Sequence, residues 1–176
     1  MPFDPFAGDA ARAVERVPYH IGLVTTSLEA AQASLFALFD VEWTPVQLAE
    51  ELEFFGSEGH VRCTARTVHS TGPVPLRFEV VEGGPGTVWH TDRELELHHL
   101  AYWSPDVAAD VGALTHDGWS LELTALDDHG RPSVFAYMRK PDLPRIEVVS
   151  LERHARYSAL VCFDVSTSPF SVERRS

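Results

Sequence analysis

Two histidines and two glutamates recur at matching points in the two halves of the chain. His20 lies in the segment YHIG, and the pair His98-His99 lies in the segment HHLA. Each segment is followed far downstream by an apolar-Glu-Val-Val tetrad, which contains Glu79 in the first half and Glu147 in the second. Two imidazoles and two carboxylates suit a divalent ion such as Zn, Ni, Co, Fe or Mn, with positions left open for water or substrate oxygens. If the halves face each other, the repeat predicts one shared metal site.

The elements that must position these residues also repeat, in the order βαβββ. In the first half, apolar periodicity predicts a helix capped by Ser27 and strands at 19–25, 43–55, 61–68 and 75–82. In the second half, it predicts a helix that begins at 104–106 and ends at Gly118, and strands at 95–103, 121–126, 133–139 and 145–151. The Ser-Pro-Asp start of this helix supplies a capping hydroxyl, a proline and an acid.

These patterns divide the chain into an arm, one repeated domain and an extension. The N-terminal arm covers 1–16, and a single domain of two modules covers 17–152. The modules are 17–82 and 95–152, joined by a glycine-rich loop at 83–94. The C-terminal extension, 153–176, contains an apolar stretch at 159–165 that predicts either an extra strand or a contact with a second subunit.

The duplicated pattern, with a histidine on the first strand and a glutamate on the last, resembles the vicinal oxygen chelate superfamily. That superfamily includes glyoxalase I, methylmalonyl-CoA epimerase, extradiol dioxygenases and bleomycin-resistance proteins. The resemblance covers about residues 17–152 and implies an α+β fold in which two βαβββ modules curl into a cup. It also implies a homodimer and one inward metal ligand from each of four strands: His20, Glu79, His99 and Glu147.

The choice between His98 and His99 depends on this resemblance. The sequence alone leaves both open, because it does not say which side chain points inward. In the family the ligand directly precedes an apolar-small dipeptide, here Leu100-Ala101, and this selects His99. Alternation along a strand then places His98 on the opposite face.

The ligand set predicts a reaction class. A divalent ion in an open site binds two adjacent substrate oxygens, polarises a carbonyl and stabilises the enolate or enediolate that forms when a neighbouring C–H loses its proton. A glutamate at the ion can remove this proton, and we expect Glu147 to be this base, with Glu79 as the second candidate. We therefore expect a metal-dependent isomerase, epimerase or lyase that acts on a small oxygen-rich molecule.

Two departures from known family members narrow this expectation. The chain contains no asparagine, whereas glyoxalase I holds glutathione through arginine and asparagine. Methylmalonyl-CoA epimerase usually carries glutamine where Glu79 stands and needs a second acidic base on the third strand, where this chain has Arg62 and Cys63. Glu50, Glu51 or Glu53 remain as substitutes. The alternatives are a metal-free protein that sequesters an antibiotic-like molecule and a ring-cleaving dioxygenase, which would need only three of the ligands.

Composition restricts the partners. The formal net charge is −12, and Lys140 is the single lysine. This acidity argues against nucleic acid and anionic membranes, since both require basic patches. Two cysteines without CxxC spacing, the absence of a signal-peptide pattern at the start and the lack of a long apolar run predict a soluble, cytoplasmic protein.

The remaining histidines and the large aromatic residues have simpler expected roles. Six histidines fall in predicted loops or strand ends and are expected at the polar surface: His60, His69, His90, His116, His129 and His154. Four aromatic residues are expected mainly in the core, although they are also candidates to line a pocket: Trp89, Trp103, Tyr102 and Tyr137.

Overall fold

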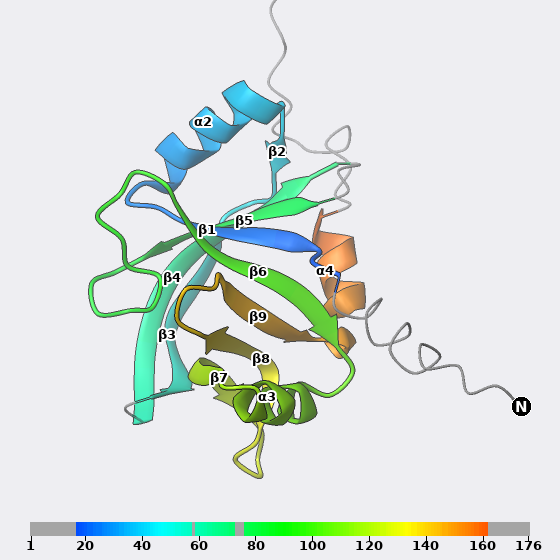
Figure 1. The fold of residues 1–176 in the computed structure, drawn as a ribbon. Coiled ribbons are helices and arrows are strands. Elements are labelled where there is room, and N and C mark those ends of the chain that lie inside the picture. Colours follow the sequence, from blue (N-terminus) through cyan, green and yellow to red (C-terminus); the bar gives the residue numbers. More distant parts are fainter. Residues whose placement is uncertain (1–16, 58, 73–75, 162–176) are drawn as a thin grey trace, which may run out of the picture.

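The computed structural model describes residues 17–57, 59–72 and 76–161 (Figure 1). The predicted arm at 1–16 and most of the C-terminal extension lie outside the described residues. Within them, the predicted βαβββ order is found twice, so the expected α+β fold is confirmed.

The first module consists of one helix and five strands, of which β2 is a two-residue edge strand. Its elements are β1 (His20–Val24), α2 (Leu28–Phe39), β2 (Glu42–Trp43), β3 (Gln47–Gly56), β4 (Gly59–Thr71) and β5 (Arg77–Gly83). The irregularity expected in 43–55 is real: β2 ends before β3, and β3 carries a register shift between Ala49 and Leu52, with Glu51 at a positive φ of 48°.

The second module repeats this order and is followed by two short helical segments. Its elements are β6 (Glu96–Ser104), α3 (Val107–His116), β7 (Ser120–Leu126), β8 (Pro132–Arg139) and β9 (Arg145–Ser150); after them come η1 (Leu151–Arg153) and α4 (His154–Val161). The helix expected from the apolar spacing of this half ends as predicted, with Gly118 at a positive φ of 83° just beyond its last turn.

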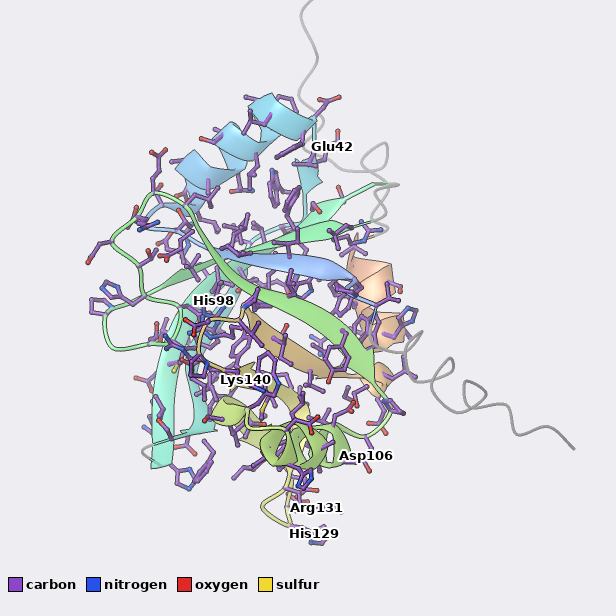
Figure 2. All side chains as sticks on the ribbon, in the orientation of Figure 1. Glu42, His98, Asp106, His129, Arg131 and Lys140 are labelled. Carbon is purple, nitrogen blue, oxygen red and sulfur yellow. The ribbon has the colours of Figure 1, made fainter. Side chains whose placement is uncertain are left out.

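Side-chain caps set the starts of both module helices. The Ser27 hydroxyl accepts a hydrogen bond from the Ala30 amide, as the sequence predicts for α2. At α3 the cap is Asp106, which accepts from the Ala109 amide, and not Ser104 (Figure 2). The predicted capping hydroxyl is therefore assigned wrongly: Ser104 ends β6, and its hydroxyl accepts from the Asp106 amide instead. Both helices bury an apolar face at three- and four-residue spacing.

The strands form one mixed sheet that closes on itself. The hydrogen-bonded order is β2-β4-β3-β7-β8-β9-β6-β1-β5, and β4 also pairs with β5. The two modules meet at two antiparallel seams, β1 with β6 and β3 with β7. Within each module the first and last strands run parallel, β1 with β5 and β6 with β9. This arrangement produces a barrel-like cup whose first strands lie side by side at its centre (Figure 1).

Three buried apolar clusters support the cup. One lies between α2 and the first module's strands, and a second lies between α3 and the second module's strands. The third is inside the cup and includes Trp89 and Tyr137, whose side chains are linked by a hydrogen bond from the indole N–H to the phenol oxygen (3.2 Å). Core packing is therefore confirmed for these two aromatic residues.

The beginning of the C-terminal extension is helical. The stretch from Ala159 was expected to be a strand or a subunit contact, but residues 159–161 belong to α4, and 162–165 lie outside the described residues. α4 lies beside the start of β1 (Figure 1). No helix in the described part of the chain is long and apolar enough to cross a bilayer.

Candidate metal centre

Strand register brings the four predicted ligands together around two small residues. On β1, Gly22 is flanked by Glu79 of β5 on one side and by His99 of β6 on the other. On β6, Ala101 is flanked by His20 of β1 and by Glu147 of β9. The small residue two positions after each clustered histidine therefore lies between two of the other clustered residues. This explains why the motifs read His-Ile-Gly and His-Leu-Ala.

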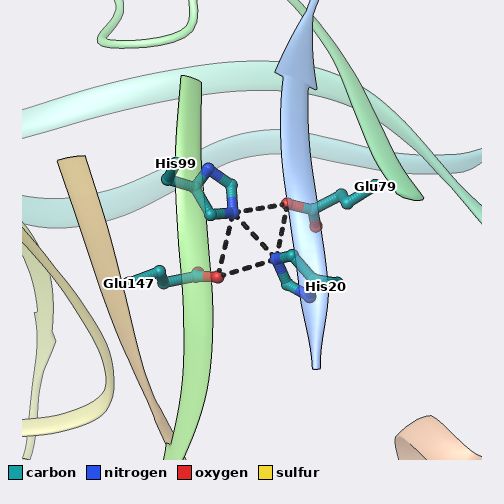
Figure 3. Close-up of side chains that lie close together, drawn as sticks. All are labelled: His20, Glu79, His99 and Glu147. Carbon is teal, nitrogen blue, oxygen red and sulfur yellow. Dashed lines mark hydrogen bonds and ion pairs between the residues drawn. The ribbon is translucent and has the colours of Figure 1, made fainter. Parts of the chain in front are cut away.

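The four ligand atoms face one point from opposite sides (Figure 3). His20 Nε2 and His99 Nε2 are 2.8 Å apart, and Glu147 Oε2 lies 3.3 Å from the first and 3.2 Å from the second. Glu79 Oε2 lies 3.6 Å from His20 Nε2 and 3.3 Å from His99 Nε2. All four atoms lie within 4.8 Å of one another. Ligands at about 2.0–2.2 Å from a divalent ion are separated by distances of this size.

Unsatisfied polar atoms indicate which kind of ion fits the cluster. His99 is 0% exposed and His20 is 2% exposed. The Oε2 atoms of Glu79 and Glu147, which face the cluster, are buried and have no hydrogen-bond partner in the described structure. Two buried carboxylate oxygens that lack a hydrogen bond are costly when they face each other, and a cation between them removes this cost. The donor set therefore fits a divalent ion.

His99 passes directly over the backbone of β1. A Cβ atom placed on Gly22 would lie 1.9 Å from Cε1 of His99, 2.2 Å from Nδ1 and 2.3 Å from Nε2. Only a residue without a side chain leaves room for this imidazole. Gly22 is thus required by the site and not by a turn.

His98 is also part of the centre, contrary to the expectation that it lies on the opposite face. The pairing of β6 with β1 shifts from Gly22–His99 to Leu23–Leu97, so His98 is an extra residue and strict alternation fails there. His98 is buried (Figure 2), and its Nδ1 lies 2.8 Å from Nδ1 of His99. Its Nε2 lies 2.9 Å from the Val88 carbonyl oxygen.

These contacts define a chain of hydrogen bonds that orients His99. The Val88 carbonyl can only accept, so Nε2 of His98 carries the hydrogen. Burial and the neighbouring charge of His99 lower the pKa of His98 to about 3, so its ring is neutral and its Nδ1 accepts. His99 then donates from Nδ1 to His98, which leaves His99 Nε2 directed at the cluster. Arg145 supports the same segment: it donates to the carbonyl of His98 and makes a two-pronged ion pair with Glu122.

His69 is the second histidine that sequence reasoning placed wrongly. It was expected at the polar surface, but it is buried on β4, and its Nε2 lies 3.7 Å from Oε1 of Glu79. The register pairs His69 directly with Glu79 across β4 and β5. The other five histidines in this group are exposed, as expected.

The charges of the cluster stabilise one another in the metal-free state. Burial lowers the pKa of His99, but the carboxylates of Glu147 and Glu79 outweigh this effect and raise it to about 9. Burial raises the pKa of Glu147, yet the adjacent imidazoles of His99 and His20 outweigh this effect and bring it well below its usual range. The pKa of Glu79 is lowered in the same way. Both carboxylates are therefore ionised at neutral pH, as metal ligands must be.

The centre lies between two cavities. The larger has a volume of about 700 Å³ and is lined by residues of β1, β3, β4, β5, β6, β8, β9, η1 and α4, including Trp103 of β6. The smaller, of about 160 Å³, is lined by Phe54, Cys63, Trp89 and their neighbours. Among the described residues, the acidic residues that line these two cavities are Glu79 and Glu147, and each of them lines both. At the third-strand position, the cavity therefore presents Cys63, whose thiol pKa is raised by burial, and not a carboxylate.

Three solved structures of enzymes have a similar fold. A variant of methylmalonyl-CoA epimerase from Streptomyces coelicolor, bound to 2-nitronate-propionyl-CoA, matches with a TM-score of 0.52 and 17% identity, over 76% of this chain and 95% of its own. Methylmalonyl-CoA epimerase from Mycobacterium tuberculosis matches with a TM-score of 0.54 and 15% identity, over 76% and 86%. A variant of 4-hydroxymandelate synthase from S. coelicolor matches with a TM-score of 0.50 and 14% identity, over 76% and 48%. At these identities the likeness shows the fold.

Comparisons of sequence give the family. No curated protein has a significantly similar sequence. A family profile nevertheless matches residues 19–137, a range that contains three of the four clustered residues and stops before Glu147. The matched range covers most of the chain and agrees with the duplicated modules and the closed sheet. The chain belongs to the glyoxalase/bleomycin resistance protein/dioxygenase superfamily.

Proposed function

We propose that the protein is a divalent-metal-dependent enzyme that transfers a proton at a carbon next to a carbonyl of a small, oxygen-rich molecule. The reaction would be an isomerisation, an epimerisation or a lyase step. The observation that carries this proposal is the convergence of two imidazoles and two carboxylates at the wall of a cavity of about 700 Å³. A cavity of this size accommodates a small-molecule substrate.

In this proposal His20, Glu79, His99 and Glu147 hold the ion. A divalent ion so bound supplies Lewis acidity, which makes the carbon next to a chelated carbonyl more acidic. The chain's own residues supply the rest: His98 keeps His99 in the tautomer that a ligand needs, and the aromatic side chains around the cluster exclude water from it. The expected use of Zn, Ni, Co, Fe or Mn follows from the mixed N/O donor set.

Glu147 is the proposed base, with Glu79 as the alternative. Both carboxylates line the larger cavity. Glu79 has a further neighbour, because its Oε1 lies 3.7 Å from Nε2 of His69. The ion-pair contacts of Glu147 in the described structure are with His20 and His99, the two ligand histidines. Glu147 is therefore the carboxylate with fewer constraints on turning toward a substrate C–H.

The first test is metal content. Wild-type protein, refolded or dialysed with each of the five metals, should bind one ion per chain, and His99→Ala should lose it. His129→Ala is the matched control, because His129 lies on an exposed turn and lines neither cavity. Metal-loaded protein should then catalyse exchange of deuterium from D₂O into a panel of hydroxy-ketones and 1,3-dicarbonyl compounds, followed by NMR.

The outcomes separate this function from its alternative. Stoichiometric metal with exchange that Glu147→Gln abolishes would support an enzyme of this class. A wild-type protein that binds small molecules but takes up none of the five metals would support a sequestering protein instead. The expected homodimer is checked in the same preparation by light scattering, since the described chain by itself does not test it.

A further inference from the structure

One wall of the larger cavity comes from residues that follow the second module. Arg153 of η1 and Arg156, Tyr157 and Leu160 of α4 all line this cavity. Their spacing of three and four residues places them on one face of a continuous helical segment. This face is therefore the one that borders the cavity, opposite the strands that carry the ligands.

This wall brings positive charge to a cavity that otherwise contains acidic groups. Arg153 and Arg156 are exposed, and no carboxylate forms an ion pair with either of them in the described structure. Five of the other seven arginines of the described residues are paired with an aspartate or glutamate: Arg62, Arg66, Arg131, Arg139 and Arg145. Of the remaining two, Arg77 donates to the Ser70 and Gly72 carbonyls, and Arg93 does not line the cavity. The two guanidinium groups at the cavity thus have donors available for a bound molecule.

A third polar group on the same wall also lacks a partner. The Tyr157 hydroxyl is buried and has no hydrogen-bond partner among the described residues. The Tyr157 ring lies close to the cluster, with its centroid 5.2 Å from that of His69 and 6.4 Å from that of His20. A buried hydroxyl of this kind usually finds a partner, so a ligand oxygen near the cluster is the group that it fits.

The remaining lining is largely apolar or aromatic. Trp103, Phe135, Val134, Val149 and Pro45 border the cavity. Trp103 is also stacked on Tyr19, with ring centroids 3.9 Å apart, so this surface is rigid. It suits a flat or apolar molecular body between the cluster and the two arginines.

We propose, building on the function inferred above, that the substrate is a small organic oxyanion. Its paired oxygens face the four ligands, with Tyr157 as an additional hydrogen-bond donor. Its apolar body packs against Trp103 and Phe135, and a carboxylate or phosphate group at its far end pairs with Arg153 and Arg156. Because the protein carries a net charge of −12, it repels anions at long range, and local cations at the cavity are needed to bind one.

Matched chelating probes test this proposal. Benzohydroxamic acid binds divalent ions through two adjacent oxygens, and its 4-carboxylate and 4-carboxamide derivatives have nearly the same shape but differ in charge. Calorimetry on cobalt-loaded protein should show the carboxylate binding about tenfold more tightly than the carboxamide. The 4-phosphono derivative tells a preference for phosphate from a preference for carboxylate.

The variants separate charge recognition from metal chelation. In the double variant Arg153→Gln/Arg156→Gln, the preference for the carboxylate should fall to about twofold or less, while binding of the carboxamide stays unchanged. Tyr157→Phe should weaken both probes by a similar factor. Arg93→Gln removes the same charge at a position that does not line the cavity, and it should keep the preference. Thermal melts check that each variant is folded.

The result that would overturn the proposal is a wild-type protein that binds both derivatives equally, or a double variant that keeps the preference. If the proposed metal dependence is wrong, the experiment gives a different result. If the protein takes up no cobalt, benzoate and benzamide, which do not need a metal, are compared on the same variants. A tenfold preference for benzoate that depends on the two arginines would then support the anion site while refuting the metal-dependent enzyme.

Discussion

Replacing Gly22 by alanine tests the geometry of the site with a single methyl group. The new Cβ would lie 1.9 Å from Cε1 of His99, whereas ordinary van der Waals contact begins at 3.4 Å, so the ring must move by 3.4 − 1.9 = 1.5 Å. Metal–ligand distances tolerate changes of about 0.2 Å. We therefore expect Gly22→Ala to remove His99 from the ligand set and to weaken metal binding at least about 100-fold. Overpacking should also cost about 1–3 kcal/mol of stability.

The assay is competition between the protein and a chelator of known affinity, combined with thermal unfolding of the metal-free protein. Gly112→Ala is the matched control. Gly112 is exposed on α3, and a Cβ there meets no atom within 4 Å. This change should leave metal affinity unchanged and stabilise the helix by about 0.5–1 kcal/mol.

A double-mutant cycle makes the test independent of the absolute stability. When the ring is first removed by His99→Ala, adding Gly22→Ala should cost less than about 0.5 kcal/mol, because the clash is gone. Equal costs in the two backgrounds, or wild-type metal affinity in Gly22→Ala, would show that the imidazole does not lie over this glycine.

Three further predictions follow from the surroundings of the site. His98→Asn should retain most of the metal affinity, because the amide oxygen of asparagine reaches about the position of Nδ1. His98→Gln should lower the metal affinity by about 10–100-fold. Equal affinities of the two variants in the chelator competition would contradict the role of His98 in orienting His99. In the metal-free protein, the pKa of His99 is raised to about 9, so protonated His99 contributes stability that is complete below about pH 6.5 and lost as the pH rises through 9. The Tm of the wild-type protein should therefore fall across that pH range, whereas the Tm of His99→Gln should not. Asp106→Ala removes the α3 cap and should lower the free energy of unfolding by about 1 kcal/mol in urea titrations, with Asp128→Ala on an exposed turn as the unaffected control.

The fold and the four clustered residues could be predicted from sequence because a repeat doubles each weak signal. A histidine on one strand and a glutamate on a later strand are weak evidence for a site when they occur once. Their recurrence at matching points of two βαβββ modules indicates a duplicated module with one shared site. Strand bounds were predicted to within a few residues at β6, β8 and β9, where apolar residues and turn signals are dense. The capping aspartate of α3 was missed because the preceding serine satisfies the same pattern, and only the hydrogen bonds distinguish them.

The roles of His98 and His69 could not be predicted for physical reasons. Alternation along β6 fails at a register shift, which has no signal in the local sequence, and this shift turns His98 inward. His69 is brought to Glu79 by the pairing of β4 with β5, a contact that depends on how the sheet closes. The position of η1 and α4 at the cavity is likewise tertiary information, because the sequence of a helical face does not specify which part of the fold it packs against.

The larger cavity is lined by two parts of the chain, the strands of the closed sheet and the helical segment that follows them. Its four clustered histidine and glutamate side chains lie on strands whose hydrogen-bond register is shared by both repeats, so a change in one strand disturbs all of them. Its helical side sits on eleven residues, 151–161, that lie outside this register. Substitutions in this segment can change which molecules enter the cavity without disturbing the alignment of the four clustered side chains. For protein engineering, this short terminal segment is the natural place to diversify when a new specificity is sought on an unchanged scaffold.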